Sequence, residues 1–204
     1  MANSAPFEVI AAPVTLWFAN VGTAFPALDA TPGAGWTKVG SSGSQNYDRG
    51  EGVTIEHRQT TVPWRSVGDT GTRKSFRTEE DLIIRLKLVD VTLEQYAIAL
   101  NNNTVTDTPP GAGTIGTRKI GLSRGTSITT KALLIRSEAS PYGADFVSQY
   151  EVPMAQQVGS PTVAQGKPGE PSGLNLEFMA LVDTSAASAD ERFGRLIAQD
   201  AAAV

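Results

Sequence analysis

The chain has 204 residues, with 17 Lys and Arg, 21 Asp and Glu, and no cysteine. Its net charge of −4 gives no general attraction to nucleic acid or anionic membranes. The lack of cysteine excludes disulfides and zinc–thiolate sites. The longest apolar runs are far short of the ~20 residues that a membrane helix needs, and residues 1–20 lack the basic region of a signal peptide. We expect one domain over residues 1–204, used in a cytosol or exported only as part of something larger.

The first quarter of the chain has little regular pattern. Residues 1–12 are small and apolar and predict a loose arm, and residues 13–19 (PVTLWFA) predict a first strand. Residues 40–52 (GSSGSQNYDRGEG) are small and polar and predict an exposed loop. A loop this long is more often functional or mobile than a plain connector.

Residues 53–102 predict a strand, a loop, a strand and a helix. Residues 82–89 alternate: one face has Leu82, Ile84, Leu86 and Leu88, and the other has the β-branched and charged residues Ile83, Arg85, Lys87 and Val89. This period of two predicts a half-buried strand. The same alternation begins at Val53, so the two strands predict a long hairpin with its tip at residues 63–74.

The predicted helix follows at once. Thr92 and Gln95 have the spacing of a capping box. We expect one apolar stripe to pack against the leucine face of the hairpin; its members are Leu93, Tyr96, Ala97 and Leu100. Three asparagines then end the helix, because asparagine tolerates the left-handed conformation found at helix ends.

The second half predicts strands at residues 118–123, 131–137, 147–154 and 174–182. A Gly-, Pro- and Ser-rich stretch at 159–173 predicts a surface loop. Residues 188–199 predict a second short helix, with Asp190 and Glu191 in its first turn. The expected fold is mainly β (α+β): a β-sandwich or barrel-like domain with a long hairpin and two short flanking helices.

Some motifs match enzyme signatures, but the neighbouring residues do not predict the elements that those signatures need. Residues 111–116 match G-x-G-x-x-G, but two prolines precede them and no helix follows. Residues 121–125 match G-x-S-x-G, but that motif needs a helix after the serine and a later histidine, and the only histidine is His57. Neighbouring carboxylates at Glu79, Glu80 and Asp81 would point to alternating faces of a strand. We therefore expect no catalytic, metal or cofactor-binding residue.

The central stretch resembles the major tail tube protein of long-tailed bacteriophages and gene transfer agents. The similarity lies in GVTIEHRQTTVPWRS, in RTEEDLIIRLKLVDVTLEQYAIALNNNTVT and in the closing LEFMALVDTSAASADERFGRLIAQ. The resemblance implies a β-sandwich whose copies close into rings of six, stacked into a hollow tube that carries double-stranded DNA to the host. It also implies a place in the virion tail, assembled in the host bacterial cytoplasm, with a tape measure protein, a tail terminator and baseplate or tip proteins as partners.

Two sets of residues are candidates for this assembly, and the long polar loop at 40–52 is a further candidate for the contact between rings. The hairpin tip mixes aromatic and charged residues of the kind that anchor interfaces, so it is the candidate ring-stacking loop: Trp64, Arg65, Asp69, Arg73 and Lys74. The resemblance places the long hairpin's sheet on the inner wall, where Glu56 and Glu151 are the candidate lumen residues. Basic residues on the same faces depart from a purely acidic wall, and we expect them to be charge-paired; they are Arg58, Arg85 and Lys87.

Two other interpretations stay open. One is another tail protein of related fold, such as a terminator or a sheath-like protein. The other is a non-catalytic ligand-binding β-sandwich. The second lacks an evident stacking platform, because Trp17, Trp36 and Trp64 fall in different segments.

Overall fold

The computed structural model describes residues 13–138, 147–164 and 172–199. Within these residues the chain is mainly β, as the sequence predicts, and all of its paired strands are antiparallel. A nine-stranded sheet and a separate two-stranded sheet account for the strands. The predicted arm at 1–12 and residues 165–171 of the predicted loop at 159–173 lie outside the described residues.

The large sheet is not built in chain order. Its main path runs β2 (Thr37–Lys38), β1 (Val14–Asn20), β7 (Thr130–Ser137), β8 (Ser148–Gln157), β10 (Gly173–Ala180), β4 (Lys74–Leu88), β3 (Val53–Trp64). Two short strands join it from the side: β11 (Arg195–Ala198) pairs with β8, and β9 (Val163–Ala164) pairs with β10. The small sheet contains β5 (Val105–Thr108) and β6 (Thr117–Ile120).

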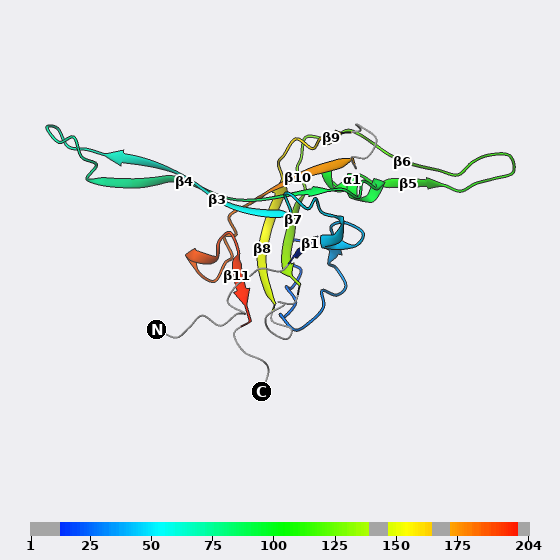
Figure 1. Ribbon diagram of the computed structural model, residues 1–204, viewed down its shortest axis with the longest axis horizontal. Coiled ribbons are helices and arrows are strands. Elements are labelled where there is room, and N and C mark those ends of the chain that lie inside the picture. The colour runs from blue at the N-terminus through cyan, green and yellow to red at the C-terminus, as the bar shows by residue number, and fades with distance from the viewer. Residues whose placement is uncertain (1–12, 139–146, 165–171, 200–204) are drawn as a thin grey trace.

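The sheet bends sharply, and the bend encloses the core. Figure 1 shows β7, β8 and β11 running down the picture while β3, β4 and β10 run across it. The apolar face predicted for residues 82–89 is confirmed, because its four residues are all buried, but Ile83 on the opposite face is buried as well. The four residues of the apolar face join residues of the same alternation on the neighbouring strands; the large buried members are Leu16, Leu133, Ile135, Val152, Leu174, Leu176 and Phe178.

Residues 39–48 bring the two ends of the bent sheet together. Here the structure corrects the sequence analysis, which expects residues 40–52 to be an exposed loop. The short 3₁₀ helix η2 (Gly43–Asn46) lies in this segment, and both Gly43 and Tyr47 are buried. The Tyr47 hydroxyl accepts from the Leu16 amide at 2.9 Å and donates to the Val39 carbonyl at 2.8 Å, while its backbone bridges to Leu88 of β4. The segment is therefore partly buried although its composition is polar, because its polar groups are satisfied by hydrogen bonds to distant parts of the chain.

The helix α1 (Leu93–Ala99) forms where the sequence predicts it, and the Thr92 side chain accepts from the Gln95 amide. The buried face differs from the predicted stripe: Gln95, Ile98 and Ala99 are buried, whereas Leu93, Tyr96 and Ala97 are only partly buried. The reason is that the Gln95 side chain turns inward and accepts from the Gly40 amide at 2.8 Å. Among the predicted stripe residues only Leu100, the C-cap, is buried.

The prediction of a helix at residues 188–199 is wrong. This segment contains the 3₁₀ turn η3 (Ala189–Glu191) and then strand β11. Gly194 lies between them at φ 123°, and a Cβ there would lie 2.1 Å from the Glu151 carbonyl oxygen. The segment therefore does not form a helix. Gly194 makes a close backbone contact with β8, and β11 pairs with the free edge of β8.

Candidate assembly surfaces

Two arms leave the core in opposite directions (Figure 1). One is the outer part of the β3–β4 hairpin and the other is the β5–β6 hairpin. In the first, β3 and β4 pair from Val53 with Leu86 to Trp64 with Lys74. A strand of 12 residues spans about 40 Å. An isolated two-stranded hairpin is marginally stable in water, so an arm of this length calls for contacts beyond its own chain.

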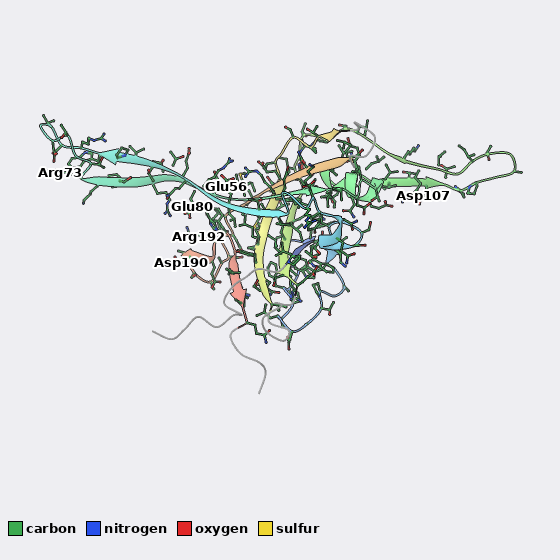
Figure 2. The ribbon with its side chains drawn as sticks, in the orientation of Figure 1. Glu56, Arg73, Glu80, Asp107, Asp190 and Arg192 are labelled. Carbon is green, nitrogen blue, oxygen red and sulfur yellow. The ribbon has the colours of Figure 1, made fainter. Side chains whose placement is uncertain are left out.

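The candidate ring-stacking residues all lie at the far end of this arm, where Figure 2 labels Arg73. The loop is closed by the Arg73 amide, which donates to the Trp64 carbonyl at 3.0 Å. Asp69 organises the turn, because its carboxylate accepts from the Gly71 amide and from Arg73 Nε at 2.9 Å. These hydrogen bonds lower the pKa of Asp69. The tip thus has internal order while Trp64 and Val67 remain exposed.

An apolar face precedes the tip. Val62 pairs directly with Phe76, and Trp64 lies two residues further along the same side of β3. All three are about half exposed, at 51%, 56% and 50%. The register shifts at Thr60 and Thr61, and the Thr78 hydroxyl donates to the Thr60 carbonyl. This arrangement is a β-bulge of the kind that re-aims side chains. Contiguous exposed apolar residues commonly mark protein contacts.

Paired charges cover the base of the same hairpin, near the Glu56 label in Figure 2. The Glu56 carboxylate is bound by Arg58 Nε at 2.8 Å and by Arg85, and Arg85 Nε also binds Glu177 at 2.7 Å. Hydrogen bonds from Arg58 and then Arg85 lower the pKa of Glu56 to about 2. On the same side of β4, Lys87 pairs with Asp48 at 3.3 Å. The basic residues on this face are thus charge-paired within one chain, as the sequence analysis expects for them.

Glu151, the second candidate lumen residue, does not lie on an open face. Only 3% of its side chain is exposed, and it accepts from Arg195 Nε at 2.6 Å and from the Gln149 amide at 2.5 Å. The sequence analysis places it outward because it treats β8 as having one solvated face. Strand β11, predicted there as a helix, pairs with the edge of β8 instead, and its Arg195 lies directly opposite Glu151 and binds its carboxylate.

The sequence analysis does not predict the second arm, the β5–β6 hairpin. Residues 109–116 form its loop, in which Gly111 and Thr114 make an isolated bridge. Ile115 in this loop is 84% exposed. Arg118 fastens the base of the arm to the core by pairing with Asp107 across the hairpin at 2.6 Å and with Glu94 of α1. The only hint in the sequence is the Asp107 and Arg118 pair flanking a proline- and glycine-rich turn.

Asparagines fix the chain that returns from this arm. Asn101 and Asn102 both have positive φ, which ends α1 as predicted. The Asn101 amide donates to the Ser127 carbonyl at 2.7 Å and its oxygen accepts from the Thr129 amide at 2.6 Å. Asn103 donates to the Gly121 and Ser123 carbonyls. The residues that match G-x-S-x-G are therefore held as a turn beneath the arm.

The remaining chemistry-bearing residues are dispersed. His57 lies exposed on β3, whereas Ser123 lies at the base of the other arm. Glu79 accepts from the Thr60 hydroxyl and Glu80 pairs with Arg77. In the described part of the chain, no three His, Asp or Glu side chains come together as a metal site, and no helix is long and apolar enough to cross a membrane.

Comparison with known proteins gives a match in fold but none in sequence. No protein-family model matches the sequence, and no curated protein sequence matches it. The chain is similar in structure to a chain in a solved structure described as "Cryo-EM structure of the anti-feeding prophage (AFP) baseplate, 6-fold symmetrised". The TM-score is 0.53 and the identity is 8%, over 97% of this chain and 97% of the other. At this identity the match shows a shared fold over the whole length of both chains.

Proposed function

We propose that this chain is a structural protein of a phage-type tail, and that its copies form rings that stack into the tail tube. The observation that carries the proposal is the fold match, which spans 97% of both chains and is to a component of a 6-fold symmetrised baseplate. A match over the whole length supports one tail-type domain rather than a shared fragment. The resemblance of residues 52–66, 77–106 and 176–199 to tail tube proteins points the same way.

The arms give this proposal a physical basis. They leave the core in opposite directions and carry exposed apolar side chains that the described residues of the same chain do not cover. Contact between different surfaces of identical copies closes a ring if its rotation allows, and otherwise continues as a filament. Stacked rings need both kinds of contact. We assign the tip around Trp64 and Arg73 to the contact between rings.

The charge-paired face around Glu56 is proposed to line the channel. A wall of unpaired basic residues would bind DNA phosphates by releasing counterions. On this face Arg58, Arg85 and Lys87 each have a carboxylate partner. Double-stranded DNA would then pass without binding. The proposal retains the virion tail as the location, assembly in the host bacterial cytoplasm, and the tape measure, terminator and baseplate or tip proteins as partners.

A second candidate is a tail protein that forms one ring at the baseplate or tail end. The description of the similar structure as a baseplate favours it. This candidate shares the proposed fold and ring symmetry with the first and differs only in the contact between rings.

Electron microscopy of the purified full-length chain over a range of concentrations separates these candidates. Tubes of stacked rings are the expected result, with mass confirmed by sedimentation. Single rings that never stack would favour the baseplate-type ring. A monomer at the highest concentrations would contradict both and leave the ligand-binding module.

A further inference from the structure

The β5–β6 arm ends in an apolar loop that is folded on itself. The backbones of Gly111 and Thr114 exchange two hydrogen bonds of 3.1 Å, and a Cβ on Gly116 would lie 3.0 Å from the Pro110 ring. Residues 108–117 contain no charged side chain, and Ile115 among them is 84% exposed. A loop that is already ordered loses little conformational freedom when it packs against an apolar surface.

The outer part of the β3–β4 arm offers such a surface. Val62, Trp64 and Phe76 share one face and are each about half exposed. An aromatic side chain buries about 150–250 Å² when covered, so the exposed part of this face is on the order of 300 Å². A stable pair of free proteins needs about 800 Å² on each partner. The face is therefore too small to hold two free chains together, but it suffices where several copies bind at once.

The two surfaces have to come from different copies. The arms leave the core in opposite directions (Figure 1), so the β5–β6 loop and the apolar face of the β3–β4 arm cannot meet within one chain. Copies repeated along the line of the arms bring the β5–β6 arm of one copy to the β3–β4 arm of the next. Such a contact joins different surfaces of identical chains, so it can repeat.

Charge on the two arms is complementary as well. Lys74 lies opposite Trp64 on the apolar face and belongs to no ion pair among the described residues. On the other arm, Arg118 is shared by the carboxylates of Asp107 and Glu94, whose side chains are 66% and 50% exposed. Two carboxylates beside one guanidinium leave a negative charge for a cation from another molecule.

We propose that Ile115 in the β5–β6 loop of one copy packs on Val62 and Phe76 of the next copy. Asp107 then faces Lys74 in the same contact. Lys74 is further from its core than Phe76 is, and Asp107 is nearer to its core than the loop is, so arms that overlap from opposite ends align both pairs. This inference rests on the proposed function, because it names the surface that receives the β3–β4 arm in the contact between rings.

Cross-linking within assembled particles tests the contact directly, because the chain has no native cysteine. Val62→Cys chains are mixed with Ala112→Cys chains, assembled, and treated with a short bismaleimide; Phe76 and Ile115 stay in place. We expect a covalent dimer whose linked peptides, identified by mass spectrometry, contain positions 62 and 112. The matched control replaces Val62→Cys by Thr61→Cys, which is exposed on the opposite face of β3, and should give several-fold less dimer.

Electron microscopy of the same samples separates the outcomes. Stacked rings without a dimer above the Thr61→Cys control would overturn this inference and leave the proposed function standing. A dimer that forms equally in dilute, unassembled chains would also overturn it, because the product would then reflect collision and not assembly. Absence of rings from the wild-type chain would contradict the proposed function and this inference together.

A double-variant cycle gives a second measurement. Phe76→Ser and Ile115→Ser should each leave the melting temperature of the isolated subunit unchanged, because both side chains are exposed in it. Each should raise the protein concentration needed for stacking by about tenfold, since an apolar side chain loses its burial. The double variant should be little worse than either single variant, because both changes remove one shared contact. Effects that multiply would contradict direct contact between the two residues.

Discussion

Tyr47 shows how a single residue closes this fold. Its ring is buried, and its hydroxyl joins β1 to the end of the segment that follows β2, while its backbone bridges to β4. Three parts of the chain that are distant in sequence thus meet at one side chain. Burial raises the pKa of Tyr47 to about 12.

Tyr47→Phe should lower the free energy of unfolding by about 1–3 kcal/mol, because the Leu16 amide and the Val39 carbonyl lose a partner while buried. Chemical denaturation at neutral pH measures the loss. The folded pKa lies above the ordinary value of 10, so the tyrosine's contribution is complete below pH 10 and is lost as pH rises towards 12. The difference between wild type and Tyr47→Phe should therefore narrow over that range. Tyr96→Phe is the control, and equal losses would contradict this role.

Leu86 and Lys87 test the register of β4. Leu86 is 3% exposed in the main core, whereas Lys87 points to the opposite face and pairs with Asp48. Leu86→Ala should cost about 2–5 kcal/mol of unfolding free energy through lost burial and a cavity. Lys87→Ala should cost no more than about 1 kcal/mol, as for partly exposed ion pairs. Thermal unfolding compares the two variants, and similar shifts would mean that the register is wrong by one residue.

Among the elements, the β3–β4 hairpin has two different roles along its length. Its inner half belongs to the large sheet, where β10 pairs with β4 over residues 83–88. Its outer half pairs only with itself, and residues 57–64 and 74–80 are exposed. Stability should therefore depend on the inner half, and assembly on the outer half.

Removal of residues 66–72 should separate these roles. The subunit should fold with an unchanged melting temperature, because these loop residues contact no core element, but it should form no long tubes. Circular dichroism and electron microscopy measure the two results. Replacement of residues 65–73 by Asn-Gly is the matched variant, since that pair favours a two-residue hairpin turn. Tubes of normal length from both variants would exclude the tip from the contact between rings.

At the scale of the whole molecule, the charges on the face around Glu56 are balanced by local ion pairs. The chain's net charge of −4 is small, and the face around Glu56 combines acidic and basic residues within hydrogen-bond distance. Such a face has little net potential beyond a Debye length of about 8 Å at physiological salt. This property would suit the proposed channel, through which DNA has to pass without binding.

Assembled tubes should therefore retain no short duplex DNA at about 50 mM salt, where phosphate contacts are strongest. Glu56→Lys should create retention that falls steeply with salt, because it removes the partner of Arg58 and one of the two partners of Arg85, and adds a positive charge. Asp190→Lys makes the same change of charge on η3, outside the β3–β4 hairpin, and should have a smaller effect. Filter binding measures retention. Strong salt-dependent retention by the unmodified tubes would contradict a passive channel.

Local pattern determined much of this structure. The apolar face of residues 82–89, the cap at Thr92 and the left-handed asparagines after α1 are all as the sequence predicts, because each depends on neighbours within a few residues. The same locality explains why the G-x-G-x-x-G and G-x-S-x-G matches could be interpreted as turns. The mainly β class follows from the number of such alternating segments.

Only the tertiary structure decided where distant segments meet. Residues 188–199 have a helical apolar stripe, but they form a turn and strand β11, because the edge of β8 offers backbone partners and Gly194 fits against Glu151. Tyr47 and Gln95 are buried because they satisfy backbone groups far away in the chain. Glu151 is buried beside Arg195 of β11, which binds its carboxylate. Long-range hydrogen bonds and strand edges leave no periodic signal in the sequence, so only the tertiary structure shows them.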